Sequence, residues 1–232
     1  RFGNALKNTA LLTVVISICE NALALGLALL VDNVIKGKNL FRAIFYLPVI
    51  LSGIVSGFIW KIMYSYNFGP VNKVLDMIGL GALKQDWLGN ADIAIWAVAV
   101  VMIWKGAGYY MIIYLAALQG VPQDVQEAAT IDGASKTKQF FSITVPMITP
   151  VIFYNLVTQI AQAFQEFNGP YIITQGGPRN ATTLVSLLVY NYAFKSNEMG
   201  MACALAWVMF IAVALLTVIA FTSQKHWVYY AD

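Results

Sequence analysis

The chain has 232 residues, of which 59% are hydrophobic and only 11% are charged, and its formal net charge is +3. Charged residues make up about 25% of an ordinary soluble domain, so this composition excludes that class. The small positive charge forms no basic patch between aromatic residues, so we expect no nucleic-acid partner. His226 is the single histidine, and Cys19 and Cys203 lie in apolar segments, so the sequence predicts no metal site.

Five segments are long and apolar enough to cross a bilayer, which takes about 20 consecutive apolar residues. In hydrocarbon every backbone polar group must be satisfied within the segment, so these spans are predicted to be helices. We therefore expect an all-α integral membrane protein that forms a single transmembrane domain over residues 1–232. The predicted spans are 10–31, 44–64, 93–118, 145–167 and 200–223.

The first span and the loop that follows it set the expected orientation. Glu20 and Asn21 lie midway along the span, where a buried pairing is a better expectation than contact with cargo. The short loop carries Lys36, Lys38 and Arg42, and the positive-inside rule places it in the cytoplasm. Basic residues summed over all loops divide almost evenly, so the orientation depends on this one loop. Alternation then puts 65–92 and 168–199 outside and 119–144 inside.

The third span carries an ammonium group in the middle of an apolar helix. Lys105 lies beside Gly106 and Gly108, which makes this the one span that looks broken. Ionisable residues within spans are costly and are functional candidates by default. Three interpretations stay open: an ion pair with Glu20 or Glu166, a snorkelling side chain, or a counter-charge for an acidic ligand. The candidate pathway residues here are Lys105, Gly106, Tyr109 and Tyr110.

The connector over 120–144 is unusually polar and structured for a link between two spans. Pro122 suits the first turn of a short helix, and Glu127 then lies near the positive end of its dipole. Gly133 suits the left-handed residue that closes this helix, and Ser135 is predicted to cap a second short helix through Phe141. Helices this short are marginal alone in water and need a partner surface. The alternative is an amphipathic connector packed on its own bundle.

This connector resembles the EAA loop of ABC-importer permeases, where Glu-Ala-Ala precedes a glycine, an isoleucine and a proline. The matching residues are Glu127, Ala128, Ala129, Gly133, Ile143 and Pro146. Further segments look like the carbohydrate-uptake class of these permeases, which includes the maltose, glycerol-phosphate and lactose types. They include Phe45–Pro48, Gly69–Asn72, Trp104–Gly106 and Thr174–Pro178.

The resemblance implies a permease of a bacterial or archaeal plasma membrane whose EAA loop is cytoplasmic and couples to an ATPase subunit. It implies a lipid-embedded complex with a second homologous permease as a heterodimer, two copies of the ATPase and an extracytoplasmic solute-binding protein. The family core has six helices, so we expect one more helix before Arg1. The implied coupling residues are Glu127, Ala128, Ala129, Asp132, Gly133 and Ala134.

The chain carries no phosphate-binding Gly-x4-Gly-Lys-Ser/Thr motif. We therefore expect that it is not an enzyme and holds no cofactor of its own. ATP and Mg would be bound by the partner ATPase subunits.

A stripe of polar residues follows the connector, on the fourth span. Asn155, Gln159, Gln162 and Glu166 follow at steps of four, three and four, which places them on one face of a helix. Amides, an acid and nearby aromatic rings suit sugar hydroxyls. Hydrogen bonds between membrane helices are an equally weighted alternative. In the family these regions handle the translocated sugar, which favours a role in lining the pathway.

We therefore expect an importer of a sugar or oligosaccharide, and Lys105 raises the further expectation of an acidic cargo. One alternative is an ion-coupled secondary transporter, which predicts inverted repeats and paired broken helices. A membrane scaffold without transport is another, but it leaves the polar stripe without a purpose. One apolar outer segment, 183–194, is too short to span and is predicted to lie at the interface.

Overall fold

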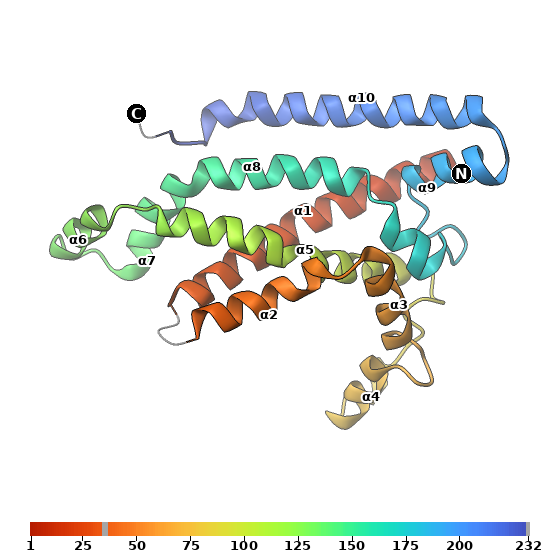
Figure 1. The fold of residues 1–232 in the computed structure, drawn as a ribbon, viewed down its shortest axis with the longest axis horizontal. Coiled ribbons are helices and arrows are strands. Elements are labelled where there is room, and N and C mark those ends of the chain that lie inside the picture. Colours follow the sequence, from red (N-terminus) through yellow and green to blue (C-terminus); the bar gives the residue numbers. More distant parts are fainter. Residues whose placement is uncertain (34–36, 231–232) are drawn as a thin grey trace.

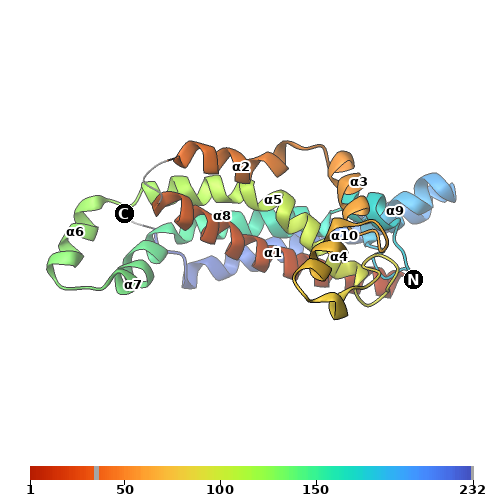
Figure 2. The same cartoon turned by 90° about the horizontal axis from the view of Figure 1, so that it is seen from below.

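The computed structural model describes residues 1–33 and 37–230, and within these ranges all regular elements are helical. Two perpendicular views show an elongated bundle in which α1, α2, α5, α8 and α10 run along the long axis (Figures 1 and 2). The long helices are α1 (Phe2–Asn33), α2 (Lys38–Ile50), α5 (Ala94–Gln119), α8 (Val145–Phe164) and α10 (Met199–Ser223). The short ones are α3 (Gly53–Met63), α4 (Pro70–Met77), α6 (Gln123–Ile131), α7 (Lys136–Gln139) and α9 (Val185–Tyr190).

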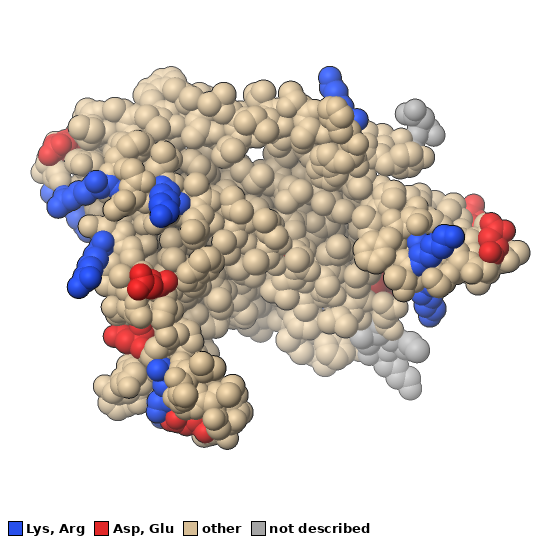
Figure 3. Space-filling model, turned by 180° about the vertical axis from the view of Figure 1, so that it is seen from behind, with Lys and Arg blue, Asp and Glu red and all other residues tan. Residues whose placement is uncertain are grey.

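Four helical segments of the described chain are long and apolar enough to cross a membrane, and they match four of the five predicted spans. They are Phe2–Asn33, Ala94–Gln119, Lys136–Phe164 and Met199–His226. On the face drawn in Figure 3, charged side chains gather toward the two ends of the molecule, and the band between them is almost free of them. This distribution is what a bilayer-embedded bundle requires. Lys36, which contributed to the predicted orientation, lies outside the described residues.

The fifth predicted span, 44–64, is not one straight helix. It consists of α2 and α3, which meet at an angle of 96°. Leu51 and Ser52 between them are extended, with ψ of 134° and 140°. Pro48 lies inside α2, where its missing N–H removes one hydrogen bond to the preceding turn, and the helix ends at Ile50. The hydropathy of the sequence reveals the apolar segment but contains no information about the bend within it.

The expectation of a broken third span was wrong, because α5 is one continuous helix through Lys105 and Gly108. The two glycines serve close packing instead of a break. A Cβ at Gly106 would overlap the carboxylate of Glu20 on α1, and a Cβ at Gly108 would overlap the backbone carbonyl oxygen of Phe45 on α2. Glycine is therefore needed at position 108 for the approach of the α2 backbone, whereas a Cβ at position 106 would displace the side chain of Glu20.

We expect Gly108→Ala to destabilise the protein, because its methyl group meets backbone oxygen that cannot rotate away. Overpacking of this kind costs about 1–3 kcal/mol. Thermal unfolding in detergent should show a clear decrease in Tm. Gly26→Ala on α1 is the matched control, since nothing lies within 4 Å of its Cβ position. An equal Tm for the two variants would contradict the close α2–α5 contact.

The inner part of the bundle is formed by α1 packed along α5 and α8. Its largest buried cluster joins Ala24 and Ala28 of α1 to Met111 and Tyr114 of α5 and Ile148 of α8. Small residues on α1 let the larger side chains of α5 approach it closely. In contrast, α10 contacts only a short stretch of the bundle through α8 and α9, and its apolar side chains are largely exposed.

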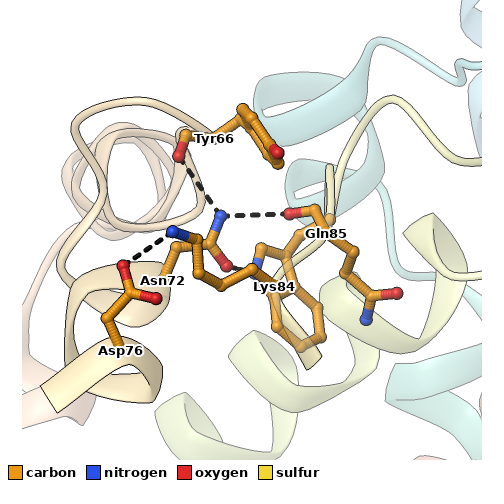
Figure 4. Close-up of polar contacts among 6 residues, drawn as sticks. Tyr66, Asn72, Asp76, Lys84 and Gln85 are labelled. Atoms are coloured by element: carbon orange, nitrogen blue, oxygen red, sulfur yellow. Dashed lines mark hydrogen bonds and ion pairs between the residues drawn. The ribbon is translucent and has the colours of Figure 1, made fainter. Parts of the chain in front are cut away.

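The outer segment between α3 and α5 is held by one asparagine. Asn72 Nδ2 donates to the carbonyl oxygens of Tyr66 (3.3 Å) and Gln85 (3.1 Å), and Trp87 Nε1 donates to Asn72 Oδ1 (2.8 Å) (Figure 4). Nearby, Lys84 Nζ pairs with Asp76 Oδ2 at 2.6 Å, and this hydrogen bond raises the pKa of Lys84. The segment is therefore an ordered cap on this end of the bundle.

The predicted short outer helix exists as α9, followed by a π-helical turn at Asn191–Lys195. It does not stand apart from the bundle. Val185 and Leu187 are buried, and α9 packs between α1 and α10. Thr9 Oγ1 of α1 accepts a hydrogen bond from the backbone N–H of Val185 at 3.0 Å. The start of α1 and α9 therefore form one packed unit.

Candidate functional site

A cavity of about 380 Å³ opens between α1, the α2–α3 bend, α5, α8 and the turn that follows α8. This size is within the range of small-molecule sites in proteins. Seven of the eight predicted pathway residues lie in its wall. They are Lys105, Gly106, Tyr109, Tyr110, Gln159, Gln162 and Glu166. The two sequence regions singled out as pathway candidates therefore face one space.

Asn155 is the exception. It lies one helical turn before Gln159 on α8, is fully buried and does not line the cavity. The four polar residues share a helix face as predicted, but the cavity extends only as far as Gln159. In the described part of the chain neither polar atom of the Asn155 amide has a hydrogen-bond partner. Helical periodicity predicts a shared face and carries no information on where a cavity ends.

Glu20 and Asn21 have different surroundings in the structure. Asn21 makes the predicted buried pairing: its Nδ2 donates to Gln159 Oε1, and its Oδ1 accepts from the hydroxyl of Tyr114. Glu20 was expected to behave in the same way, but it lines the cavity instead, with its carboxylate against Gly106. Adjacent residues on a helix point about 100° apart, which separates the two side chains.

Three ionisable side chains border the cavity: Glu20 from α1, Lys105 from α5 and Glu166 just beyond α8. Within the described residues, the single ion pair closer than 4.0 Å is Lys84–Asp76, so Lys105 makes no direct ion pair with either acid. Glu166 Oε1 accepts a hydrogen bond from the backbone N–H of Gly169 at 2.9 Å, which anchors the turn after α8. Two carboxyl groups thus face one ammonium group across the cavity.

The sequence reasoning missed the contribution of the α2–α3 bend. Ser56 and Gly57 of α3 lie in the cavity wall together with Gly53. A Cβ at Gly57 would lie 2.7 Å from Ile172 Cγ2, so this glycine allows α3 to pack on the turn Pro170–Thr174. The signal in the sequence was the run of small residues in an otherwise bulky apolar segment.

The predicted connector forms the opposite end of the molecule, where α6 and α7 project from the bundle (Figure 1). Gly133 is left-handed, with φ of 76°, and Ser135 Oγ accepts from the backbone N–H of Lys138 at 3.3 Å. Both conformational predictions are confirmed. The second helix was not predicted correctly: α7 ends at Gln139 and continues through the π-helical turn Phe140–Thr144 into α8.

The coupling residues implied by the resemblance differ in their exposure on and after α6. Ala129 is buried within the chain, so it packs inward and is not part of an exposed surface. Ala128 and Asp132 are exposed, and Ile131, which sequence reasoning passed over, is 87% exposed. Glu127 Oε1 accepts a hydrogen bond from Gln123 Nε2 at 2.8 Å along the same helix. Glu127, Ala128, Ile131 and Asp132 thus form the solvent-facing part of α6 and its C-terminal end.

Gln139 connects the two parts of this projection. Its Nε2 donates to Thr130 Oγ1 of α6 at 3.1 Å and to the carbonyl oxygen of Ala134 at 2.8 Å. α7 continues through the π-helical turn into α8, the helix that carries Gln159 and Gln162. One continuous helical segment therefore joins the projection to the cavity.

Comparison with known proteins agrees with this architecture. Residues 20–228 match the family model described as binding-protein-dependent transport system inner membrane component. The probable ABC transporter permease protein YesP of Bacillus subtilis is 40% identical over 210 residues, which cover 89% of this chain and 67% of YesP. The multiple sugar-binding transport system permease protein MsmF of Streptococcus mutans is 35% identical over 97% of this chain and 77% of MsmF.

Among solved structures, a chain of a bacterial ABC transporter involved in the import of the acidic polysaccharide alginate superimposes with a TM-score of 0.87. The match covers 97% of this chain and 79% of that chain at 24% identity. At this identity the likeness is one of fold. The bent α2–α3 pair and the projecting α6 thus belong to a fold that transport proteins use.

Proposed function

This chain belongs to the family of binding-protein-dependent transport system inner membrane components, and we propose that it forms the translocation pathway for a sugar or oligosaccharide in an ABC importer. The observation that carries the proposal is the cavity in the middle of the bundle. Amides, tyrosine hydroxyls and carboxyl groups face it from three long apolar helices. Burying these polar groups in a membrane protein is costly unless a polar cargo uses them.

In this proposal, ATP hydrolysis takes place on separate subunits, which bind ATP and Mg, and α6 transmits the motion. The exposure of Ile131 and the anchoring of α6 to α7 by Gln139 support this role. The α6–α7 projection faces the cytoplasm, and the opposite end of the bundle receives the solute-binding protein. The ordered segment around Asn72 lies at that opposite end.

The complete transporter is proposed to contain a second, homologous permease. A permease with five or six membrane helices is expected to offer half of a pathway. Charged side chains are scarce along α10, and its apolar residues are exposed to lipid or to a neighbouring subunit. The second permease would supply the other wall.

Native mass spectrometry of the purified complex tests this assembly. We expect one copy of this chain, one copy of a homologous permease and two copies of an ATPase subunit. The heterodimer follows from the resemblance to carbohydrate importers, many of which use two distinct permeases. Two copies of this chain in one assembly would contradict the heterodimer.

The function itself is tested by the ATPase rate of the same complex in nanodiscs. A sugar-loaded solute-binding protein should raise the rate well above that of the complex alone, and the unloaded binding protein should raise it less. If sugar and binding protein have no effect on ATP turnover, the assignment as a sugar importer is wrong.

The charges of the cavity bear on the kind of sugar. Lys105 alone suggested an acidic cargo, but two carboxyl groups, Glu20 and Glu166, share the cavity with it. The cavity thus combines an ammonium donor with two carboxyl groups and amides, a set that pairs with sugar hydroxyls and needs no charge on the cargo. We therefore propose an uncharged sugar or oligosaccharide as the cargo.

The ion-coupled alternative receives little support. It predicts paired broken helices in two repeats. In the described residues, α2 with α3 is the one bent pair of membrane length, and α5 runs unbroken.

A further inference from the structure

We propose that a column of four aromatic side chains transmits the docking of the solute-binding protein on the outer cap (residues 65–92) to the wall of the cavity. The column consists of Trp104 of α5, Trp60 of α3, Tyr64 at the end of α3 and Trp87 of the outer cap. This inference rests on the proposed function. The four side chains lie outside the cavity wall and act on it through α3, so they are positioning residues.

The four rings of the column follow one another in contact. The ring centroids of Trp104 and Trp60 are 5.4 Å apart, and those of Trp60 and Tyr64 are 5.2 Å apart. The centroids of Tyr64 and Trp87 are 6.1 Å apart. Aromatic pairs at these separations attract each other beyond the effect of the area that they bury. The Tyr64 hydroxyl also donates to the backbone carbonyl oxygen of Ala97 on α5 at 3.2 Å, which fixes the middle of the column.

The outer end of the column is built into the cap. Trp87 Nε1 donates to Asn72 Oδ1, the amide that orders the cap (Figure 4). The cap also turns back tightly onto α3: a Cβ at Gly69 would lie 2.3 Å from the carbonyl oxygen of Met63, the last residue of that helix. A displacement of the cap therefore moves Trp87 and the end of α3 together.

The inner end of the column reaches the cavity. Tyr64 belongs to a buried cluster with Val101 of α5 and Ile173 of the turn after α8, and Trp60 and Met102 pack against this cluster. Val101, Met102 and Ile173 line the cavity. The opposite side of α3 contributes its own small residues to the same wall. One packed cluster therefore extends from the cap to the cavity.

The element that this column positions has a hinge. α3 leaves the bundle at 96° to α2, through the extended residues Leu51 and Ser52 (Figure 1). Its main contacts are with the turn Pro170–Thr174 and with α5. The Trp60 indole N–H is buried and has no hydrogen-bond partner within the described residues, so ring packing holds this side chain. A short helix on a two-residue hinge is the kind of element that changes its angle as a unit.

The consequence for transport follows from linkage. A binding protein that fits the cap better at one angle of α3 shifts the population toward that angle. Because the column joins the cap to α3, the same shift changes the cavity wall. Two of the segments that resemble the carbohydrate-uptake class, Gly69–Asn72 and Trp104–Gly106, lie at the two ends of this connection.

The test uses the complete complex in nanodiscs and measures two quantities: ATP turnover with and without sugar-loaded binding protein, and the Kd of the binding protein for the complex without nucleotide. Trp60→Leu keeps an apolar side chain but removes two ring contacts. We expect it to lower the stimulation of turnover about tenfold, within the range of coupling between sites in proteins. Turnover without binding protein and the Kd should stay level, because the cap surface is unchanged. Trp60→Phe keeps a ring and should retain most of the stimulation.

A double-mutant cycle tests the contact itself. Trp104→Leu removes the same ring pair from the side of α5 and should cause a similar loss. The double variant should lose no more than either single variant, since both act through one contact. Trp96→Leu is the matched control, because Trp96 lies on the same helix, is 47% exposed and its ring lies outside the column. It should keep full stimulation.

Full stimulation in Trp60→Leu, or additive losses in the double variant, would overturn the column and leave the sugar-importer assignment standing. A Kd that rises in proportion to the lost stimulation would also overturn it, since Trp60 would then only support the docking surface. If Trp60→Leu does not assemble, Trp104→Leu against Trp96→Leu decides by the same criteria. Absence of any stimulation in the unaltered complex would reject the proposed function and the column together.

Discussion

Replacement of Ile131 by aspartate is expected to abolish coupled transport while the permease still folds and inserts. Ile131 is 87% exposed at the end of α6, so the change creates no cavity within the chain. If the surface around Ile131 is buried against an ATPase subunit, the variant places an unpaired charge in that interface. Breaking an interface in this way costs about 3–5 kcal/mol, which corresponds to an increase of more than a hundredfold in the Kd for the ATPase subunit.

The measurement is ATP turnover of the reconstituted complex with sugar-loaded binding protein, together with size-exclusion chromatography to follow ATPase association. Ile131→Leu is the control, because it keeps an apolar side chain of similar volume and should retain most of the activity. Normal turnover in Ile131→Asp would show that α6 does not dock on the ATPase.

Gly133→Leu should also reduce ATP turnover, but for a different reason. The backbone φ at Gly133 is 76°, a conformation that strains any residue with a side chain, although no atom lies within 4 Å of the Cβ position.

Removal of the single ammonium group of the cavity is the second change with a large expected effect. In Lys105→Met, Glu20 and Glu166 remain in one cavity without a positive charge. Methionine removes the N–H donors that Lys105 offers to sugar hydroxyls, and it removes the positive charge that faces the two carboxyl groups. We expect the uptake of a neutral sugar to fall about tenfold or more, the size of effect that loss of a charged hydrogen bond gives.

Lys105→Arg keeps the positive charge and should retain far more of the uptake than Lys105→Met. The same pair of variants distinguishes the neutral cargo from an acidic one. If Lys105→Met leaves neutral-sugar uptake intact and removes only uronate uptake, Lys105 is a counter-charge for cargo and the acidic interpretation is correct. Thermal stability of both variants should be measured in parallel to show that the complex remains assembled.

The helices and most of the residues in the cavity wall could be predicted from the sequence. Apolar runs of membrane length predict helices because hydrocarbon leaves no other partner for backbone groups. The step of four, three and four along Asn155, Gln159, Gln162 and Glu166 predicts one face, and three of the four meet at the cavity. Gly133 and Ser135 were predictable because a left-handed residue and a cap are local properties of the chain.

What could not be predicted depends on contacts between distant segments. Whether a glycine breaks a helix or admits a neighbour depends on what packs against it: Gly106 and Gly108 receive Glu20 and the backbone of Phe45. The 96° bend at Leu51 and Ser52 is stabilised by packing of α3 on the turn after α8, more than 100 residues away. Glu20 and Asn21 are neighbours in sequence, yet only the arrangement of α1 between α5 and α8 decides which one faces the cavity.

The most direct test of the account is sugar uptake into sealed proteoliposomes that contain the complete complex. Labelled maltose and the binding protein are added outside, and ATP with Mg is enclosed inside. Each component is left out in turn, with and without an imposed proton or sodium gradient. Uptake against a concentration gradient is expected only when binding protein and ATP are both present, and the ion gradients should have no effect. Uptake that follows an ion gradient in the absence of ATP would contradict it and would identify an ion-coupled transporter instead.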